Sequence, residues 1–345
     1  MELTPKSLED TEDRANIAVS SRDYTFREAG DHDFRGIEAL FEQKGKGRGW
    51  AVWKYRKNPD GRARVFIVED PGKTIVGTLA YLPRRFAIAG RGTLTVMQVV
   101  DIFLTAELRE NRVFLGLLEF GRRHIREARI GVPNQFSSIF GSGPGWRILG
   151  YYETWQFPVL IGGLLVGGTY AFAAPLLNVL SRIYLSAWLP GKHRDLEMRQ
   201  ISRFCRDYAL DSAVNHGVRS ADYLNWRFVD NPIGNYQVYE FVEKNETVGY
   251  CVFTRSDSTA KLSEFVATRR RRGCMRRLIE HCRETEFARI SYSGTGLRLG
   301  SLGFIRHGYR HDCVAYKLPE GQWFVTGCDI DSEPGRTPLA SGQAP

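Results

Sequence analysis

The sequence contains one ordered set of motifs twice, and this repetition constrains the fold more than any other feature. Each copy has an aromatic and basic stretch that ends in Asn-Pro, at Trp53–Pro59 and at Trp226–Pro232. An apolar strand pattern with a Val-Gly pair follows, then a strand pattern with an acidic residue, a basic corner, a helix pattern and a Gly-aromatic pair. The paired positions are Val76-Gly77 with Val248-Gly249, Asp101 with Glu264, and Gly145-Trp146 with Gly303-Phe304. Because internal repeats mark repeated structural units, we expect two α/β domains of one design, with Trp53 and Trp226 as core anchors.

The clearest basic corner, meaning the arginine-rich loop between a strand pattern and a helix pattern, lies in the second copy. Leu262–Ala267 has the β-branched and aromatic content of a buried strand, whereas Met275, Leu278, Ile279 and Cys282 recur at helical spacing. Four consecutive arginines and Gly273 stand between the two patterns. The N–H groups of such a loop and helix start can bind a pyrophosphate. A basic helix start on a solvated face is the alternative interpretation.

The ordered set resembles the GNAT superfamily of acyl-CoA-dependent N-acyltransferases over residues 22–155 and 196–318. The stretch from Asp101 through Asn134 to Gly145-Trp146 is similar to GNAT proteins of bacterial polysaccharide modification. The resemblance implies an α/β (α+β) fold with two GNAT-like domains, each a bent mixed sheet flanked by helices. It also implies acyl-CoA, most simply acetyl-CoA, as co-substrate and a small-molecule amine as acceptor.

The resemblance implies two sets of residues that bind acyl-CoA through strand backbone, loop and helix start. The first set is Phe103, Leu104, Thr105, Arg109, Arg112, Val113, Phe114 and Asn134, and the second is Phe265, Val266, Arg270, Arg272, Gly273, Cys274 and Met275. Arg112 and Phe114 stand where the family has small residues, whereas the second copy keeps Gly273. The second copy therefore allows closer backbone contact, and the sequence leaves open which copy binds the carrier. Cys274 lies at an electropositive helix start, where we expect its thiol pKa to fall.

Asp101 and Glu264 are the candidate general bases because they occupy the acidic position of the fourth strand in the family. Each could instead be a structural ion pair, since such pairs also perturb carboxylates. The family's usual general acid, a tyrosine four residues before the Gly-aromatic pair, is Gly141 in one copy and Leu299 in the other. Solvent or substrate then protonates the leaving thiolate, or Tyr292 serves, or the protein is not a catalyst.

The charge balance favours anionic partners. The 345 residues carry a net charge of +9 and have a pI near 9.3, which suits CoA phosphates, a nucleotide-linked sugar, a lipid surface or RNA. The six cysteines form no Cys-x-x-Cys pair and have no histidine at metal-ligand spacing, so we expect no metal and a reducing, cytoplasmic compartment. Residues 1–20 are polar and acidic, which argues against a secretory signal.

Residues 154–181 have no charged side chain over 28 positions, more than the ~20 that cross a bilayer. A single span would place the two copies on opposite faces of a membrane, and Gly162, Gly163, Gly167, Gly168 and Pro175 weaken a continuous helix. We therefore expect a buried bridging segment, partly strand and partly helix. The alternative is peripheral contact with the inner membrane face through residues 156–190.

These patterns predict a domain plan and a function. The plan is a disordered tail at 1–21, GNAT-like domains at 22–155 and 196–328, a bridge at 156–195 and a tail at 329–345, with a helix over Asp195–Ala209 opening the second domain. The function is transfer of an acetyl or other acyl group from acyl-CoA to an amine, such as an amino sugar or nucleotide-linked sugar. One alternative is a Fem-like aminoacyl-tRNA-dependent peptidyltransferase, which binds tRNA; another is a non-catalytic, CoA-binding or membrane-docked GNAT-like scaffold.

Overall fold

The computed structural model describes residues 24–42, 45–105, 108, 112–133, 144–160, 171–191, 195–308 and 310–330. It divides into two units. Unit 1 comprises Met1–Arg56, Arg62–Leu82 and Val99–Glu127, and unit 2 comprises Lys57–Gly61, Pro83–Gln98 and Ala128–Pro345. These units do not coincide with the expected domains, because strands of the first sequence copy pair with strands of the second.

Unit 1 is an antiparallel sheet with helices packed against it. Its elements are β1 (Thr25–Glu28), α2 (Phe34–Glu42), α3 (Trp50–Arg56), β2 (Arg64–Glu69), α4 (Arg112–His124) and parts of β3 (Ile75–Ile88) and β4 (Gly92–Leu104). Helix α2 buries Phe34, Ile37, Leu40 and Phe41, the apolar face that the sequence predicts. Helix α4 packs on β2 through an edge-to-face contact of Phe120 with Phe66, with ring centroids 5.6 Å apart.

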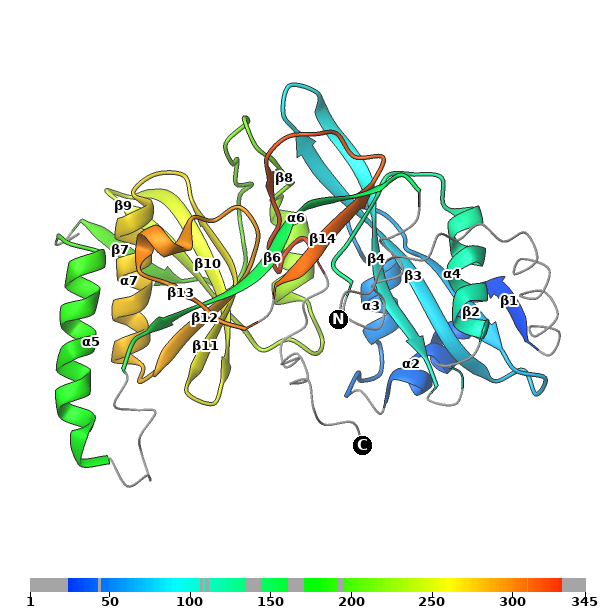
Figure 1. Ribbon diagram of the computed structural model, residues 1–345, viewed down its shortest axis with the longest axis horizontal. Helices are drawn as coiled ribbons and strands as arrows, with labels where there is room; N and C mark the ends of the chain where they lie inside the picture. Colours follow the sequence, from blue (N-terminus) through cyan, green and yellow to red (C-terminus); the bar gives the residue numbers. More distant parts are fainter. Residues whose placement is uncertain are drawn as a thin grey trace, which may run out of the picture. The chain divides into compact units, whose positions relative to one another are not determined.

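Unit 2 contains most of the strands (Figure 1). Its strand order runs from β4 through β5, β14, β6, β12, β11, β10 and β9 to β7. Its elements include β5 (Arg129–Gly131), β6 (Trp146–Pro158), α5 (Ala174–Trp188), β7 (Leu196–Gln200), β8 (Asn215–Gly217), α6 (Ala221–Leu224), β9 (Tyr236–Glu243), β10 (Glu246–Ser256), β11 (Thr259–Ala267), α7 (Arg271–Glu284), β12 (Arg289–Gly294), β13 (Ile305–Arg306), β14 (His311–Tyr316) and β15 (Trp323–Phe324).

The two sequence copies exchange their last strands within unit 2. Strand β14, from the second copy, lies between β5 and β6 of the first, with Val314 opposite Gly131 and Ala315 opposite Arg147. Strand β6 in turn pairs antiparallel with β12 of the second copy. Each copy therefore completes its sheet with a strand from the other.

The glycines of the repeat occupy equivalent places. A Cβ on Gly77 would lie 3.1 Å from Leu104 Cγ and 3.3 Å from the carbonyl oxygen of Phe103, at the end of β4. A Cβ on Gly249 would lie 2.2 Å from the carbonyl oxygen of Val266, at the end of β11. Each glycine thus allows close approach of its strand to the central strand just before the basic corner. Trp53 and Trp226 are both buried, as expected of core anchors.

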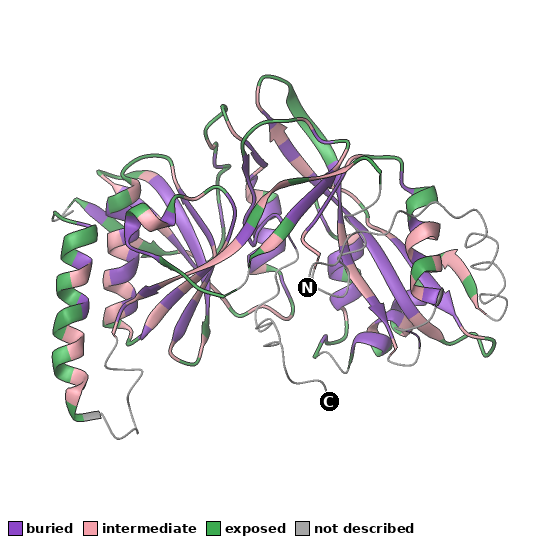
Figure 2. Ribbon diagram, in the orientation of Figure 1, coloured by how far each residue is buried: buried purple, intermediate pink, exposed green. Residues whose placement is uncertain are grey.

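The core of the second copy lies between α7 and the sheet. Met275, Leu278, Ile279 and Cys282 are buried with Leu262 and Phe265 of β11 in one apolar cluster. The helical spacing in the sequence therefore identified the correct face of α7. Figure 2 shows this buried face of α7 turned toward the central strands.

Two local predictions are wrong. The helix expected over Asp195–Ala209 is instead strand β7 at Leu196–Gln200, because pairing with β9 outweighs a local pattern that buries only Leu196. Asp329 and Ile330, expected in a disordered tail, are described and buried. The helix expected at Asn134 lies outside the described residues.

Residues 154–181 contain both a strand and a helix. Strand β6 ends at Pro158 and α5 begins at Ala174, while residues 161–170 are outside the described part of the chain. The expected burial does not hold for α5, whose Leu176 and Ile183 are among the exposed large apolar residues. Within the described ranges, no helix combines the length and the apolar character that crossing a membrane requires.

Candidate functional site

The parallel strands β11 and β12 separate near the basic corner of the second copy. They pair from Thr259 opposite Arg289 to Leu262 opposite Tyr292, after which β11 continues to Ala267 without a β12 partner in its register. On its other side β11 stays paired with β10 as far as Ala267. Sheets of this kind bind ligands where strand ends diverge, so the end of β11 is a candidate binding position.

Helix α7 begins directly after this separation, without a side-chain cap. Arg270 is its N-cap, in the left-handed conformation at φ 54°, and makes no capping hydrogen bond. Its guanidinium instead pairs with Glu243 of β9 at 2.7 Å, and Arg269 pairs with Glu246 of β10. The first N–H groups of a helix have no intrahelical partner and carry a partial positive charge. This helix start is therefore suited to an anion.

Arg271, the first residue of α7, adds a guanidinium with two nitrogen atoms that have no hydrogen-bond partner among the described residues. These two atoms, Nε and Nη2, are buried. Burial lowers the pKa of Arg271; Tyr292 raises it by less, and Arg298 lowers it further. Arg272, the next residue, is exposed. Two cationic side chains thus accompany the helix start without being paired to the acidic strand residues.

The other residues predicted to bind acyl-CoA in the second copy are buried. Phe265, Cys274 and Met275 are buried in the core beneath α7, and Val266 and Gly273 are buried as well. The predicted fall in the pKa of Cys274 is wrong. Burial raises the pKa of its thiol to about 12, because desolvation outweighs the helix start and the neighbouring Arg270.

In the first copy, the structure describes only some of the residues predicted to bind acyl-CoA. Phe103, Leu104 and Val113 are buried, and Phe114 is half-buried. The N–H of Thr105 donates to the carbonyl of Val76 at 3.0 Å. Arg109 and Asn134 lie outside the described residues, and the side chain of Arg112, at the start of α4, is not described.

Asp101 lies in a buried ion cluster of unit 1. Lys46 Nζ donates to its Oδ1 at 3.0 Å, while Lys54 Nζ at 2.6 Å and the Tyr55 hydroxyl at 2.8 Å approach its Oδ2. Burial alone would raise the pKa of Asp101, but Lys46 and Lys54 outweigh it and hold this pKa well below its ordinary value. The carboxylate is fully ionised and its lone pairs are engaged, which makes it a weak proton acceptor.

Glu264 lies in a different cluster, inside unit 2. Arg219 Nη2 donates to its Oε2 at 3.1 Å and also to Asp329 Oδ2 at 2.5 Å. The Thr326 hydroxyl donates to the same Oε2 at 2.7 Å. Burial raises the pKa of Glu264; Arg219 lowers it, but the nearby Asp329 raises it further. This carboxyl has no exposed surface.

The C-terminal turn that encloses Glu264 was missed in the sequence. Thr326 forms a bridge with Gly294 at the end of β12 and contacts Glu264 of β11, so the turn lies between the separated strands on the Glu264 side. Asp329 is also held by Arg84 Nη2 at 2.9 Å. The apolar run Trp323–Val325 was the available signal, since it forms β15 and pairs with β8.

Tyr292, the residue expected to replace the missing general acid, has no solvent-exposed hydroxyl. Tyr292 is buried, its hydroxyl has no hydrogen-bond partner among the described residues, and burial raises its pKa well above the ordinary value. Leu299, at the family's acid position, is buried, and Gly141 is outside the described residues. Among the described residues, no group of three His, Cys, Asp or Glu side chains is placed to hold a metal ion.

Comparison with known proteins gives one family match for the first copy and a shared fold for most of the chain. Residues 20–151 match the family model of the acetyltransferase (GNAT) domain. No curated protein matches the sequence.

Three solved structures share the fold at low identity, and each is matched over most of its own length. A GCN5-related N-acetyltransferase from Anabaena variabilis has a TM-score of 0.55 at 12% identity, with 85% of this chain and 72% of that one covered. A probable N-acyltransferase from Enterococcus faecalis has a TM-score of 0.56 at 8% identity, with 85% and 72% covered. A GCN5-related N-acetyltransferase from Kribbella flavida has a TM-score of 0.52 at 13% identity, with 86% and 71% covered. Residues 20–151 thus match the GNAT domain, and the chain has a mixed α/β fold similar to that of these solved structures.

Proposed function

We propose that this protein is an N-acyltransferase that binds acyl-CoA in its second copy and transfers the acyl group to an amine. The observation that carries the proposal is the separation of β11 from β12 directly before the uncapped start of α7. A strand end with free backbone groups next to a cationic helix start suits a carrier with a pyrophosphate at one end and an amide-containing arm at the other.

The residues of this copy would divide the binding between them. The N–H groups at Arg271, Arg272 and Gly273 would meet the pyrophosphate, because they are the first three of an uncapped helix. The guanidinium of Arg272 is exposed beside them and free to add a charge-assisted bond. The backbone from Phe265 to Ala267, unpaired on the β12 side, would hold the acyl-pantetheine arm.

The acceptor is proposed from the resemblance, as an amino sugar or a nucleotide-linked sugar, with acetyl as the acyl group. The thiolate of CoA can leave without a dedicated acid, since an ordinary thiol pKa is about 8.5. The amine proton then goes to solvent or substrate, because Asp101 and Glu264 are both enclosed by protein donors.

Isothermal titration with CoA and acetyl-CoA tests the proposal and its location together. Gly273→Glu places a carboxylate at the helix start, and we expect it to weaken CoA binding more than about tenfold. The matched control is Arg112→Glu at the start of α4, which should leave the affinity within about twofold. The reverse pattern would move the site to the first copy, and no heat with CoA or with several acyl-CoAs would contradict the proposal.

A second candidate is a GNAT-like protein that binds CoA without catalysing transfer. It is favoured by one observation, the complete enclosure of both fourth-strand carboxylates. Thiol release from acetyl-CoA, followed with a panel of amines, distinguishes the two functions. Binding with no amine-dependent release across the panel supports the second candidate, whereas release with any amine supports the first.

A further inference from the structure

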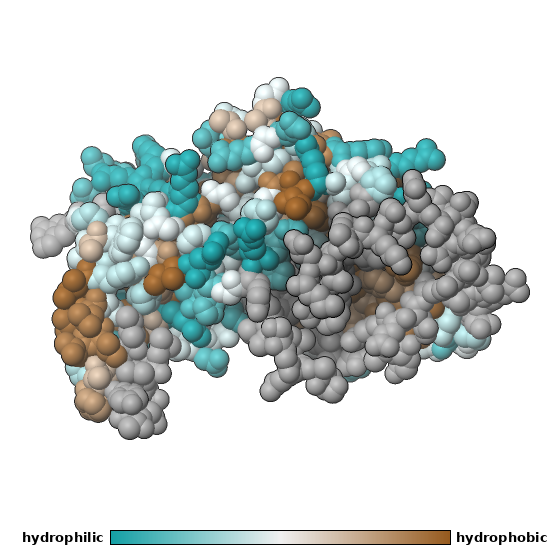
Figure 3. All heavy atoms as spheres, viewed as in Figure 1, coloured by the Kyte–Doolittle hydropathy of each residue, from teal (hydrophilic) through white to brown (hydrophobic). Residues whose placement is uncertain are grey.

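Helix α5 presents an apolar face to solvent. Phe172 just before it is 81% exposed, and Leu176 and Ile183 on it are 64% and 59% exposed. These residues recur every three or four positions with Val179 and Leu180, so they form one stripe along the helix. Figure 3 shows this stripe as a continuous apolar surface at the outer side of α5. Contiguous exposed apolar surface of this kind marks an interaction site.

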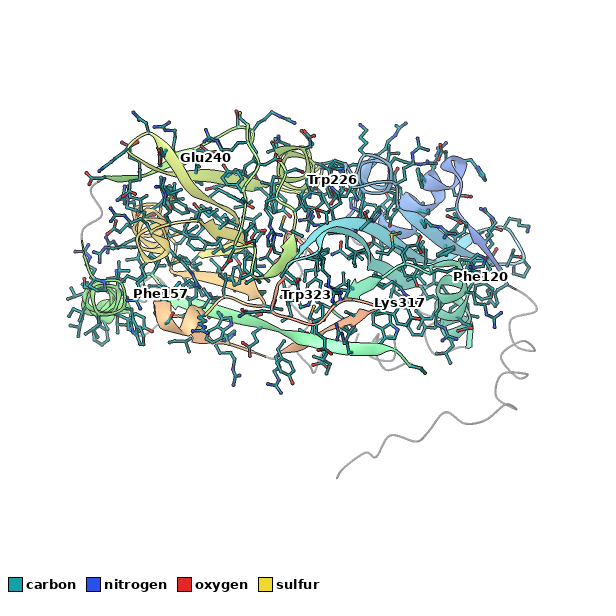
Figure 4. The ribbon with its side chains drawn as sticks, turned by 90° about the horizontal axis from the view of Figure 1, so that it is seen from above. Phe120, Phe157, Trp226, Glu240, Lys317 and Trp323 are labelled. Atoms are coloured by element: carbon teal, nitrogen blue, oxygen red, sulfur yellow. The ribbon has the colours of Figure 1, made fainter. Side chains whose placement is uncertain are left out.

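The opposite face anchors α5 to unit 2, mainly near its C-terminal end. Leu185 and Leu189 are buried in the core cluster beneath α7. The Tyr184 hydroxyl donates to the carbonyl of Gly303 at 2.6 Å, and its ring lies 5.5 Å from that of Phe157. The view from above shows Phe157 beside this helix (Figure 4). The exposed stripe is therefore carried by a helix that is fixed to the sheet.

In the sequence, the charged residues that accompany the helix have one sign. Between Glu153 and Asp195 the sequence has no acidic residue, and its charged residues are Arg182, Lys192 and Arg194. Arg182 is exposed on α5 itself. Trp188 and Tyr184, aromatic residues with a polar atom, lie at the C-terminal end of the helix. An apolar stripe with basic and amphipathic aromatic residues is the composition of helices that lie in a membrane interface.

The size of the stripe argues against a second copy as the occupant. A 15-residue helix is about 22 Å long and about 10 Å wide, so one face covers roughly 220 Å². Stable protein interfaces cover about 800 Å² per partner. A lipid surface has no such minimum, because partitioning increases with each apolar side chain that enters it.

We propose that α5 docks this protein on an anionic lipid surface, with Leu176, Val179, Leu180 and Ile183 in the interface and Arg182 at the headgroups. The docking does not depend on the proposed acyl transfer, because α5 supplies none of the residues proposed to bind acyl-CoA at the end of β11 and the start of α7.

Vesicle flotation of the full chain tests this inference. The chain should float with vesicles of phosphatidylcholine and phosphatidylglycerol, and less with phosphatidylcholine alone. The double variant Leu176→Asp/Ile183→Asp should reduce the bound fraction more than about tenfold, since two apolar side chains no longer enter the lipid. The matched control, Leu94→Asp/Leu115→Asp, changes leucines that are 36% and 37% exposed elsewhere, and should float like the unmodified chain. Arg182→Glu should weaken binding to the anionic vesicles several-fold and leave binding to neutral vesicles unchanged.

Four outcomes would overturn the inference. The first is that the unmodified chain floats with neither kind of vesicle, and the second is that the control variant loses as much vesicle binding as the α5 variant. The third is a dimer in light scattering that the α5 double variant dissociates. The fourth is that the chain binds vesicles only after residues 161–170 are deleted. The third would identify the stripe as a self-association surface, and the fourth would make that segment its occupant. Titration with CoA on the double variant should be unchanged, which separates failure of docking from failure of the proposed function.

Discussion

Asp101 and Glu264 occupy the same position in the two sequence copies, yet their surroundings shift their pKa values in opposite directions. Burial would raise the pKa of Asp101, but Lys46 and Lys54 outweigh burial, so its pKa falls. Burial raises the pKa of Glu264, and its one arginine, which it shares with Asp329, does not offset burial. Both carboxyls are almost fully buried, so burial does not distinguish them. The number of positive charges for each carboxylate decides the direction.

The largest expected difference between the two carboxyls is in the unfolding free energy of variants in which each is replaced by its neutral amide. Asp101→Asn removes the buried carboxylate that Lys46 and Lys54 both contact, and should lower the free energy of unfolding by about 3–5 kcal/mol. Glu264→Gln replaces a carboxyl that burial already biases toward its neutral form, and should change the same quantity by about 1 kcal/mol or less. Urea denaturation at pH 7 measures both. Equal losses in the two variants would show that the clusters do not differ as described.

The equivalent glycines should also differ. Gly249→Ala brings a Cβ against the backbone oxygen of Val266, which cannot rotate away, and should cost about 1–3 kcal/mol of unfolding free energy. Gly77→Ala meets the Leu104 side chain and the Phe103 oxygen at longer distances, and should cost less than about 1 kcal/mol. Thermal and urea melts of both variants check this order, and a larger loss at Gly77 would contradict it.

Thr326→Val isolates the hydroxyl that joins the C-terminal turn to Glu264. The hydroxyl donates to Glu264 and accepts from Arg219 and from the N–H of Cys328 at 3.1 Å. Its loss leaves buried polar partners unsatisfied, so we expect a decrease of about 1–2 kcal/mol in the free energy of unfolding. Thr326→Ser, which keeps the hydroxyl, is the control and should recover most of that loss.

The smallest effect is a pH dependence of opposite sign for the two carboxyls. The raised pKa of Glu264 means that the folded protein retains a proton that the unfolded chain releases near 4.5, so stability decreases as pH rises from there to the folded pKa, and then levels off. Asp101, with a lowered pKa, contributes stability above about 3.8 that is lost as pH falls toward its folded pKa. The unfolding free energy of Glu264→Gln relative to the unmodified chain should therefore rise between pH 4.5 and 7, by about 1.4 kcal/mol for each unit by which the pKa is raised. A flat difference over that range would contradict the raised pKa.

Local patterns were enough to predict the elements around the basic corner of the second copy. The switch from strand to helix between Leu262 and Ile279, and the buried face of α7, follow from periodicity and from the arginine and glycine break. In both cases the information lies within a few residues of the feature that it specifies. The equivalence of Asp101 with Glu264 rests on the repeated motifs and stays a prediction.

The partners of the two carboxyls could not be predicted, because they come from distant parts of the chain. Lys46 is 55 residues from Asp101, and Asp329 is 110 residues from Arg219. The same limit applies to β7, since a five-residue edge strand with one buried side chain has little periodicity of its own. Pairing with distant strands decides the secondary structure of such segments, and the local composition does not predict that pairing.

The exchange of β6 and β14 has a consequence for the order of events during synthesis. The first copy reaches β6 at residue 158, but its sheet lacks the strand between β5 and β6 until residues 311–316 leave the ribosome. The nascent first copy therefore keeps two strand edges unpaired until the second copy has been synthesised. The two copies cannot complete their sheets independently of one another.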